Sequence, residues 1–297
     1  MLGSTLGSVT NETPRVRLPL CLLVMIAAAS LAGPLLAHLM GADPASVDLL
    51  DRFAGPSATH PLGTDELGRD LLLRLLEGGR VSLTIGIAAA FAAAAVGTVV
   101  GLTAGYLGGW SDRVLMRFAD GVIALPLLPL LIVLAALDLN KIGVPHVIAD
   151  SPAISLIRIV VLAALVGWTT AARLVRGATL VTRNRDFVRA AQSLGAGVPH
   201  ILWRHILPNV TAPLVVATTL SVGDIILLES VLSFLGLGVQ PPLASWGSML
   251  SNAEELITSS PFLAIDPGVM IFLTVIACNL LGDALLQRFD PRGAARL

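Results

Sequence analysis

The chain has 297 residues, of which 55% are hydrophobic and only 13% are charged, and its mean hydropathy is +0.84. A soluble domain of this size has no place for so much apolar surface, so the composition predicts a membrane protein. A net charge of −1 provides no basic footprint, which argues against nucleic acid as a partner.

Six apolar segments are candidates for membrane-spanning helices, because a bilayer core about 30 Å thick is crossed by roughly 20 helical residues. They are residues 18–39, 81–106, 121–137, 153–172, 210–235 and 267–286. The third is short and holds Pro126 and Pro129, and the fourth has Arg158 near its start, so a count of five is the alternative. The predicted fold class is an all-α, polytopic membrane protein with six transmembrane helices.

The first apolar segment follows Arg15 and Arg17 and contains a small-residue run at 30–33, features that it shares with a cleaved signal peptide. Its apolar stretch continues to residue 39, which favours a retained helix. Most arginines flank the segments on the side of both termini, so the positive-inside rule predicts that both termini are cytoplasmic. The expected divisions are a cytoplasmic segment at 1–17, a first transmembrane helix at 18–39, an extracytoplasmic segment at 40–80, a core transmembrane domain at 81–287 and a cytoplasmic tail at 288–297.

A cytoplasmic loop at 173–209 inside that core contains the stretch RDFVRAAQSLGAGVPHILWRHILPN, residues 185–209. Apolar residues recur at helical spacing from Phe187 to Leu194, which predicts a two-turn amphipathic helix. Gly195 and Gly197 are expected to end it, and Pro199 to begin a second helix that Pro208 interrupts. Such a hairpin either docks into a groove on another protein or lies on lipid headgroups.

This stretch resembles the cytoplasmic loop of ABC importer permeases, whose pattern is Glu-Ala-Ala, three residues, Gly, nine residues, then Ile-x-Leu-Pro. The matching residues here are Arg189-Ala190-Ala191, Gly195 and His205-Ile206-Leu207-Pro208. Arg189 stands where the family usually has Glu, and His205 where the general pattern has Ile. The ending RHILPN is similar to the peptide and nickel branch of these permeases.

Five further stretches resemble the C-type permease subunit of dipeptide and oligopeptide importers. They are HPLGTDELGRD at 60–70, GGRVSLTIG at 78–86, GLTAGYLGGWSDRVLMRFAD at 101–120, LSFLGLGVQPPLASWGSML at 232–250 and NLLGDALLQRFDPR at 279–292. The resemblance implies a type I ABC importer permease fold in a bacterial inner membrane. It also implies four kinds of partner: a second homologous permease subunit, two ATPase subunits, an extracytoplasmic substrate-binding protein and a peptide substrate.

In that family the cytoplasmic loop carries the helix that couples the permease to an ATPase. The corresponding residues are Asp186, Arg189, Ala190, Ala191, Leu194, Gly195, Ala196 and Gly197. A nucleotide-binding P-loop needs a lysine at a fixed place, and the one lysine here, Lys141, lies in no such motif. We therefore expect no enzyme activity and no cofactor in this chain, with ATP and Mg bound by the partner ATPase subunits.

Ionisable groups at membrane depth are costly unless they face protein or water, which makes them candidates for a pathway or gating role. The candidates are Asp224, Glu229, Asn279 and Asp283. The alternative for Glu229 is a structural bond to neighbouring helices, and for Asp283 a place at the cytoplasmic boundary.

Two outer segments are candidates for docking an extracytoplasmic protein. The residues are Asp65, Arg69, Pro241, Pro242 and Trp246. The acidic and basic residues at 65–70 have helical spacing, which local salt bridges explain equally well. Trp246, Met249 and Leu250 predict a short amphipathic helix, either a re-entrant plug, a docking site or a simply packed loop.

Two other functions remain open at this point. A nickel, metal-chelate or other small-solute importer permease belongs to the same branch, but the spans lack clustered Cys, Met and His and no metal site is expected. A stand-alone secondary transporter should show inverted repeats with broken helices in matching halves, and no such segments correspond here. Peptide is the favoured cargo.

Overall fold

The computed structural model describes residues 13–137, 139–143, 145–146, 151–251 and 260–289. Its main helices are α1 (Thr13–Met40), α2 (Leu71–Leu107), α3 (Gly109–Ala124), α4 (Leu127–Ala135), α6 (Pro152–Thr182), α9 (Leu207–Phe234) and α12 (Phe262–Phe289). The shorter elements are η1 (Leu49–Asp51), η2 (Leu139–Ile142), α7 (Asp186–Ser193), α8 (Val198–Ile201), the π-helical turn η3 (Leu202–Ile206) and α10 (Trp246–Met249). Within the described ranges the chain is nearly all helical and has no strand, which confirms the predicted class.

Five helical runs of the described chain are long and apolar enough to cross a membrane, and a bent pair supplies a sixth. The five are α1, α2, α6, α12 and the run Val198–Phe234, which joins α8, η3 and α9. The prediction that Pro208 interrupts this run is wrong. Pro208 lies in the first turn of α9, where no backbone N–H is required of it, and the π-helical turn before it lets the helix continue.

The expected straight span at 121–137 is instead the pair α3 and α4, which meet at an angle of 84°. Pro126 disfavours helical backbone at the residue before it, and Leu125 is extended with ψ at 139°. Residues 111–117, which precede the predicted segment, are part of α3. Pro129 does not break α4, because it lies in the first turn of that helix.

Several helices extend beyond the apolar segments that predicted them. α2 begins at Leu71 rather than near residue 81, because the Asp70 side chain caps it by accepting a hydrogen bond from Leu73 N at 2.8 Å. α6 runs on to Thr182 although it contains Arg173 and Arg176, both of which are paired with acidic residues of α3. Hydropathy alone therefore underestimates helices whose charges find partners.

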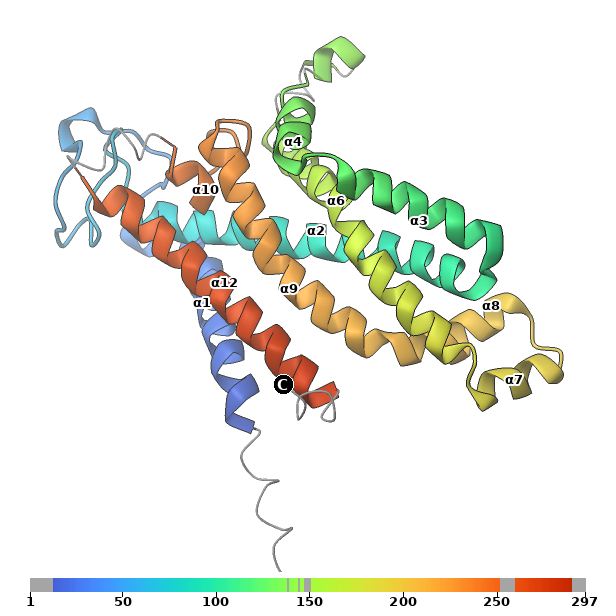
Figure 1. Cartoon of the computed structure of the whole chain (residues 1–297). Coiled ribbons are helices and arrows are strands. Elements are labelled where there is room, and N and C mark those ends of the chain that lie inside the picture. Colours follow the sequence, from blue (N-terminus) through green and yellow to red (C-terminus); the bar gives the residue numbers. More distant parts are fainter. Residues whose placement is uncertain (1–12, 138, 144, 147–150, 252–259, 290–297) are drawn as a thin grey trace, which may run out of the picture.

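The core of the bundle is the packing of α2 against α6, with α9 and α12 on the adjoining side and α1 crossing at its edge (Figure 1). A stripe of Gly97, Gly101 and Gly105 on α2 lets the two backbones approach closely. A Cβ at Gly97 would lie 2.5 Å from Cβ of Ala171, so no larger residue fits there without moving α6. The stripe continues toward the end of the bundle that carries α7.

The two ends of the bundle carry different elements. One end, called here the α7 end, carries α7 and α8, and the opposite end, the α10 end, carries α10 and the segment at 41–70 (Figure 1). Parts of the predicted N-terminal segment (1–12), outer loop (252–259) and tail (290–297) lie outside the described residues.

Candidate functional site

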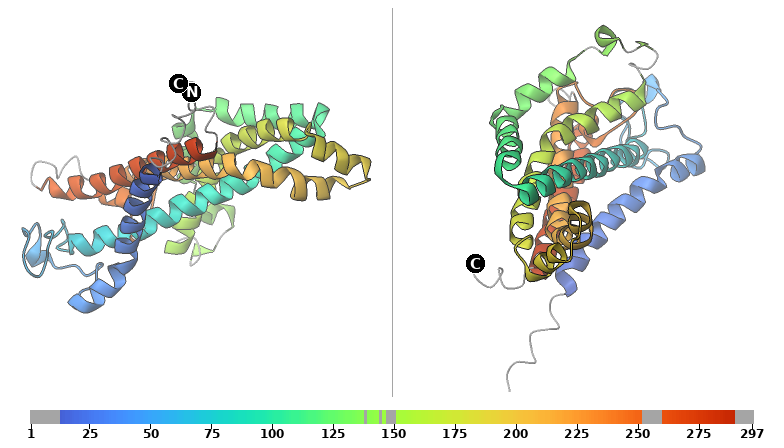
Figure 2. Two further views of the ribbon diagram at one scale, coloured as in Figure 1. Left: turned by 90° about the horizontal axis from the view of Figure 1, so that it is seen from below. Right: turned by 90° about the vertical axis from the view of Figure 1, so that its right-hand side faces the viewer.

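The hairpin at the α7 end projects beyond the other helices in the left-hand view of Figure 2. Val188 and Ala191 attach α7 to the bundle by burial, whereas Leu194 is 88% exposed. The buried apolar cluster beneath the hairpin joins it to α2, α6 and α9. Its members are Leu102, Val175, Val188, Ile201, Ile206 and Val210. The helix is therefore held on its inner side and open on its outer side.

The turn between α7 and α8 has the geometry of a Schellman helix end. Gly195 has φ at +79°, Ala196 N donates to Ala191 O at 3.0 Å, and Gly195 N donates to Gln192 O at 3.0 Å. The predicted helix end at Gly195 is confirmed, while Gly197 has ordinary extended backbone and precedes α8. The remaining predicted coupling residues, Asp186, Arg189, Ala190 and Gly197, are exposed, and Ala196 is half-buried.

Two arginine contacts that the sequence reasoning missed tie the hairpin to its neighbours. Arg183, directly after α6, donates to Gly105 O at 2.9 Å and to Tyr106 O at 3.1 Å, so it caps the last carbonyls of α2. Gln192 of α7 donates to the Tyr106 hydroxyl at 3.3 Å. The end of α2, the end of α6 and α7 are thus bonded at one place.

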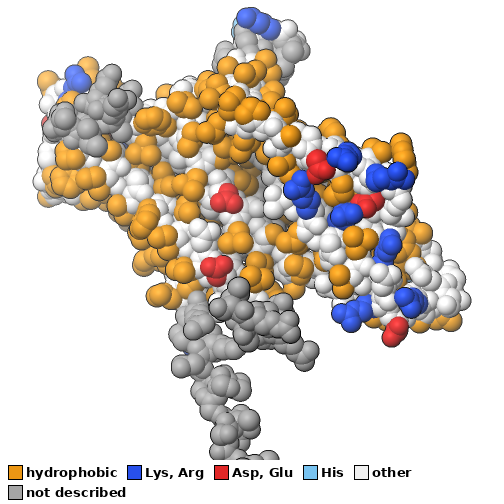
Figure 3. All heavy atoms as spheres, viewed as in Figure 1, with side chains coloured by type: hydrophobic (Ala, Val, Ile, Leu, Met, Phe, Trp, Pro, Cys, Tyr) orange, Lys and Arg blue, Asp and Glu red, His pale blue; other side chains and the backbone are white. Residues whose placement is uncertain are grey.

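A bidentate ion pair adds α3 to this assembly. Arg176 Nη2 lies 2.6 Å from Asp112 Oδ2, and Arg176 Nε pairs with Asp112 Oδ1. Arg173 and Asp120 form a second, more exposed contact at 2.6 Å. The acidic residues of α3 and the arginines of α6 are opposite in charge, a signal that could have indicated the pairing. Figure 3 shows that basic side chains gather over this end of the molecule while the middle is mainly hydrophobic.

The α10 end contains an enclosed polar network centred on Glu229 of α9, whose side chain is 0% exposed. Glu229 Oε1 accepts hydrogen bonds from Ser233 at 2.6 Å and Ser245 at 2.7 Å, and Oε2 accepts one from Ser82 at 3.3 Å. Ser82 in turn accepts from the backbone N of Trp246 at 3.1 Å. The carboxylate therefore joins α2, α9 and the start of α10.

Trp246 is also enclosed, and its indole Nε1 donates to Leu75 O at 2.9 Å. Gly78 and Gly79 on α2 leave room for it, since a Cβ at Gly79 would lie 2.8 Å from the ring. The predicted short helix at 246–249 is present and its tryptophan packs inward. Trp246 is therefore unavailable as a surface contact in this conformation, whereas Pro241 and Pro242 are exposed.

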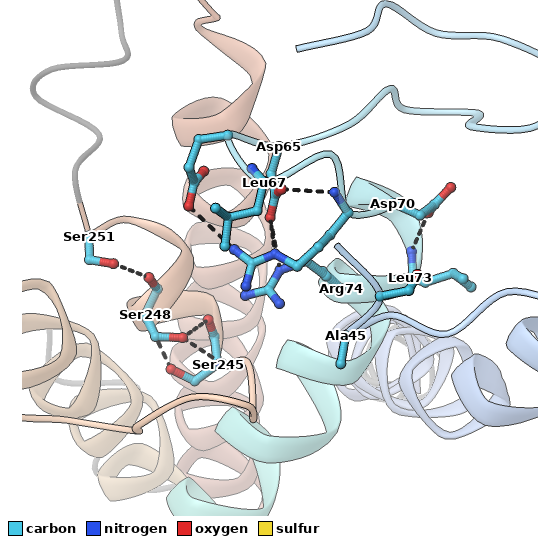
Figure 4. A network of polar contacts seen from close by, with 12 residues as sticks. Ala45, Asp65, Leu67, Asp70, Leu73, Arg74, Ser245, Ser248 and Ser251 are labelled. Atoms are coloured by element: carbon cyan, nitrogen blue, oxygen red, sulfur yellow. Dashed lines mark hydrogen bonds and ion pairs between the residues drawn. The ribbon is translucent and has the colours of Figure 1, made fainter. Parts of the chain in front are cut away.

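Residues 65–70 form a turn rather than the helix that their spacing favours, and the predicted salt bridges are present within it. Arg69 lies 2.6 Å from Asp65 and 3.3 Å from Glu66, and Arg74 lies 3.4 Å from Asp65. Figure 4 shows Asp65 and Arg74 turned toward one another beside Ser245 and Ser248. Asp65 is buried, so its carboxylate holds the turn together and is not presented to a docked protein.

The other charged or polar residues predicted at membrane depth lie on the outside of this chain. Asp224 of α9 and Asn279 and Asp283 of α12 are exposed, in contrast to Glu229. Exposed polar groups on membrane-crossing helices need protein or water around them. In the described part of the chain, no group of three or more His, Cys, Asp or Glu side chains could hold a metal ion.

Comparison with known proteins gives the class to which this architecture belongs. A family model described as the binding-protein-dependent transport system inner membrane component matches residues 97–294. The chain belongs to this family: it is a permease component of a transport system, not itself an enzyme, and a multi-pass protein of the bacterial inner membrane.

Individual relatives share the sequence over most of its length. The chain is 40% identical over 260 residues to the glutathione transport system permease protein GsiD of Pectobacterium atrosepticum, covering 88% of this chain and 74% of the relative. It is 42% identical over 260 residues to the protein of that name from Escherichia coli O157:H7, with the same coverage. A putative peptide permease protein of Brucella ovis is 39% identical over 221 residues, covering 74% of this chain and 68% of the relative.

Proposed function

We propose that this chain is one of two homologous permease subunits in an ATP-driven importer of peptides. The relatives are described as glutathione and peptide permeases, and glutathione is itself a small peptide. Two ATPase subunits, which bind ATP and Mg, and an extracytoplasmic substrate-binding protein complete the importer. This chain binds no cofactor of its own.

The observation that carries the proposal is the combination of anchoring and exposure in α7. Val188 is fully buried beneath the helix while Leu194, one turn and a half further on, is almost fully exposed. An apolar residue held out on a rigid, firmly anchored helix suits insertion into a cleft on another protein. The ATPase subunit is the partner that the family supplies for this position.

The same proposal fixes the topology. The α7 end, where the arginines gather, faces the cytoplasm, and the α10 end faces the binding protein (Figure 3). Both termini are then cytoplasmic. The exposed Pro241 and Pro242 belong to the surface on which the binding protein docks, and Asp65, Arg69 and Trp246 keep that surface in shape from within.

Coupling proceeds through contacts inside this chain. ATP binding draws the ATPase subunits together and moves α7 with its cleft. Arg183 and Gln192 pass that motion to the end of α2, and the Asp112–Arg176 pair passes it from α6 to α3. The spans then switch the pathway from inward-facing to outward-facing, and hydrolysis resets them.

The exposed polar residues of the spans face either the pathway or the second permease subunit in this proposal. Asp224, Asn279 and Asp283 are available for either role, because nothing in the described chain covers them. Glu229 acts differently. Its carboxylate is enclosed by serine hydroxyls, so it contributes to gating by holding α10 against α2 and α9.

The test is purification of the tagged chain in mild detergent, with mass spectrometry of its stoichiometric companions and an ATPase assay with and without peptide-loaded binding protein. We expect a second permease, ATPase subunits and stimulated hydrolysis. Leu194→Glu should reduce ATPase co-purification and stimulated hydrolysis by about tenfold or more, as expected for loss of an interface anchor.

Leu50→Glu is the matched control, because Leu50 is 95% exposed at the α10 end and the chemical change is the same. It should leave ATPase co-purification and unstimulated hydrolysis unchanged. Recovery of the chain without any ATPase companion, or equal behaviour of the two variants, would contradict the proposal.

A further inference from the structure

Arg158 in the second turn of α6 has no ion-pair or hydrogen-bond partner among the described residues, and its Nε is enclosed by protein. The residue lies seven positions after Ser151, which places it roughly 10 Å along the helix from the α10 end. A guanidinium stays charged at any physiological pH, so an arginine in a membrane-crossing helix needs an acceptor. The other arginines of α6 discussed above, Arg173 and Arg176, have acidic partners.

A hollow of about 380 Å³, called here the α6 hollow, lies over Arg158. The first turns of α6 form one wall, and Gln240 and Pro241 form another. Among the described residues of its lining there is no carboxylate. Within the described chain the counter-charge of Arg158 is therefore missing, and an anion that enters the hollow would supply it.

The other polar groups of the lining are largely engaged with the backbone. Ser155 Oγ donates to Gly238 O at 3.3 Å, and the Gln240 amide donates to Gly236 O at 3.1 Å and Gly238 O at 3.2 Å. Ser151 Oγ caps α6 by accepting from Ile154 N at 3.4 Å, which leaves its hydroxyl hydrogen free to donate. The N–H groups of Arg158, assisted by the Ser151 hydroxyl, are thus the donors available to an anion.

From these contacts we propose that the α6 hollow is a subsite for a carboxylate of the cargo, with Arg158 as the residue that binds it. The guanidinium fork matches a planar carboxylate, and the amino-terminal end of a 31-residue helix adds positive potential to the same place. Unmodified peptides carry a carboxylate at the C-terminus. The inference rests on the proposed function, which puts the hollow on the side from which cargo arrives.

The test compares uptake of one tripeptide in two forms, with a free C-terminal carboxylate and with a C-terminal amide. The complete importer is reconstituted in lipid vesicles with its binding protein saturated by either form. The unmodified importer should take up the carboxylate form about tenfold faster, as a charge-assisted hydrogen bond provides. Arg158→Gln should bring the two rates to within about twofold of each other by slowing only the carboxylate form. If the binding protein does not bind the amide form, peptide-stimulated ATPase activity at high peptide concentration is measured instead of uptake.

Two further variants distinguish loss of the Arg158 guanidinium from a general effect of removing a positive charge. Arg158→Lys retains a positive charge without the planar fork and should keep part of the preference. Lys141→Gln removes an exposed cation that lies outside the lining of the hollow and should keep all of it. An equal slowing of both peptides by Arg158→Gln would overturn the inference in favour of a role in subunit assembly.

Other outcomes identify where a failure lies. A preference unchanged in Arg158→Gln overturns the subsite while leaving peptide import intact. An Arg158 effect that appears only with anionic lipid in the vesicles assigns the site to a lipid phosphate and overturns it too. Failure of the unmodified importer to take up either peptide, with its ATPase companions present, overturns the peptide cargo and the subsite together.

Discussion

The two ends of this bundle place charged and apolar side chains in opposite ways. At the α7 end, charged side chains lie near the surface and an apolar residue, Leu194, is held outward. At the α10 end, a charged side chain, Glu229, and a large aromatic one, Trp246, are both enclosed. The first arrangement leaves groups free for a partner protein, and the second fixes an outer segment to the helices beneath it. Under the proposed function, the exposed apolar group marks a contact that moves and the buried polar group marks one that stays fixed.

The largest effect should follow from removing the hydrogen bonds of Glu229 at the α10 end. Glu229→Leu removes the acceptor of three hydroxyl groups that stay enclosed, and each unsatisfied polar group costs about 1–3 kcal/mol. The sum approaches the entire stability of a typical domain. We expect little folded protein, measured as the monodisperse fraction in size-exclusion chromatography and the thermal unfolding midpoint in detergent.

Two variants test whether the network itself is responsible. Glu229→Gln keeps one acceptor oxygen for Ser233 and Ser245, so it should lose less than half of what the leucine variant loses. Ser230→Ala removes a neighbouring buried hydroxyl that bonds only within its own helix, to Ile226 O at 2.8 Å, and should change the midpoint little. A leucine variant as stable as the unmodified chain would show that Glu229 does not hold α10.

An intermediate effect is expected at the α7 end, which we propose transmits motion. In a double-mutant cycle, Asp112→Asn with Arg176→Gln should show a coupling energy of about 1–2 kcal/mol, because the pair is bidentate and partly buried. The same cycle on Asp120 and Arg173, which are each 48% exposed, should give about 0–1 kcal/mol. The thermal midpoint reports stability, and the ratio of transport to ATP hydrolysis reports coupling.

Equal coupling energies in the two cycles would mean that the bidentate geometry contributes nothing. If the Asp112 and Arg176 variants lower stability but leave the transport ratio unchanged, the pair supports the fold and does not carry motion from α6 to α3.

Much of the fold follows from the apolar segments, but the contacts that distinguish the two ends do not. The segments predicted the five long apolar helices of the described chain, though not the bend between α3 and α4, and Gly195 correctly marked the end of α7. The sequence identified Glu229 as an ionisable group within a span. Its hydroxyl partner Ser82 is 147 residues away in the sequence, so the burial of the Glu229 carboxylate was not predictable.

The predicted helix boundaries were wrong for a related reason. Arginines in α6 were taken to lie beyond the membrane helix because hydropathy counts a charge without its partner. Asp112 and Asp120 supply those partners from α3, and the bend that brings α3 into position depends on a single proline, Pro126. The local sequence pattern predicted which helices form, whereas ion pairs between distant segments determine where those helices end.

The smallest effect should come from the turn after α7. Gly195→Ala places a Cβ on backbone with φ at +79°, which costs roughly 1–2 kcal/mol, although the space around it is open. Gly197→Ala is the matched control, because φ there is −68° and the nearest atom to the new Cβ is Pro199 Cδ at 4.0 Å. The cost should appear as faster hydrogen exchange at Ala196 N–H, whose acceptor is Ala191 O, with global stability nearly unchanged. Since α7 remains anchored through Val188, coupling should weaken only a few-fold. Equal exchange rates in the two alanine variants would show that the left-handed residue does not set the angle at which α7 is presented, and that the buried cluster alone does so.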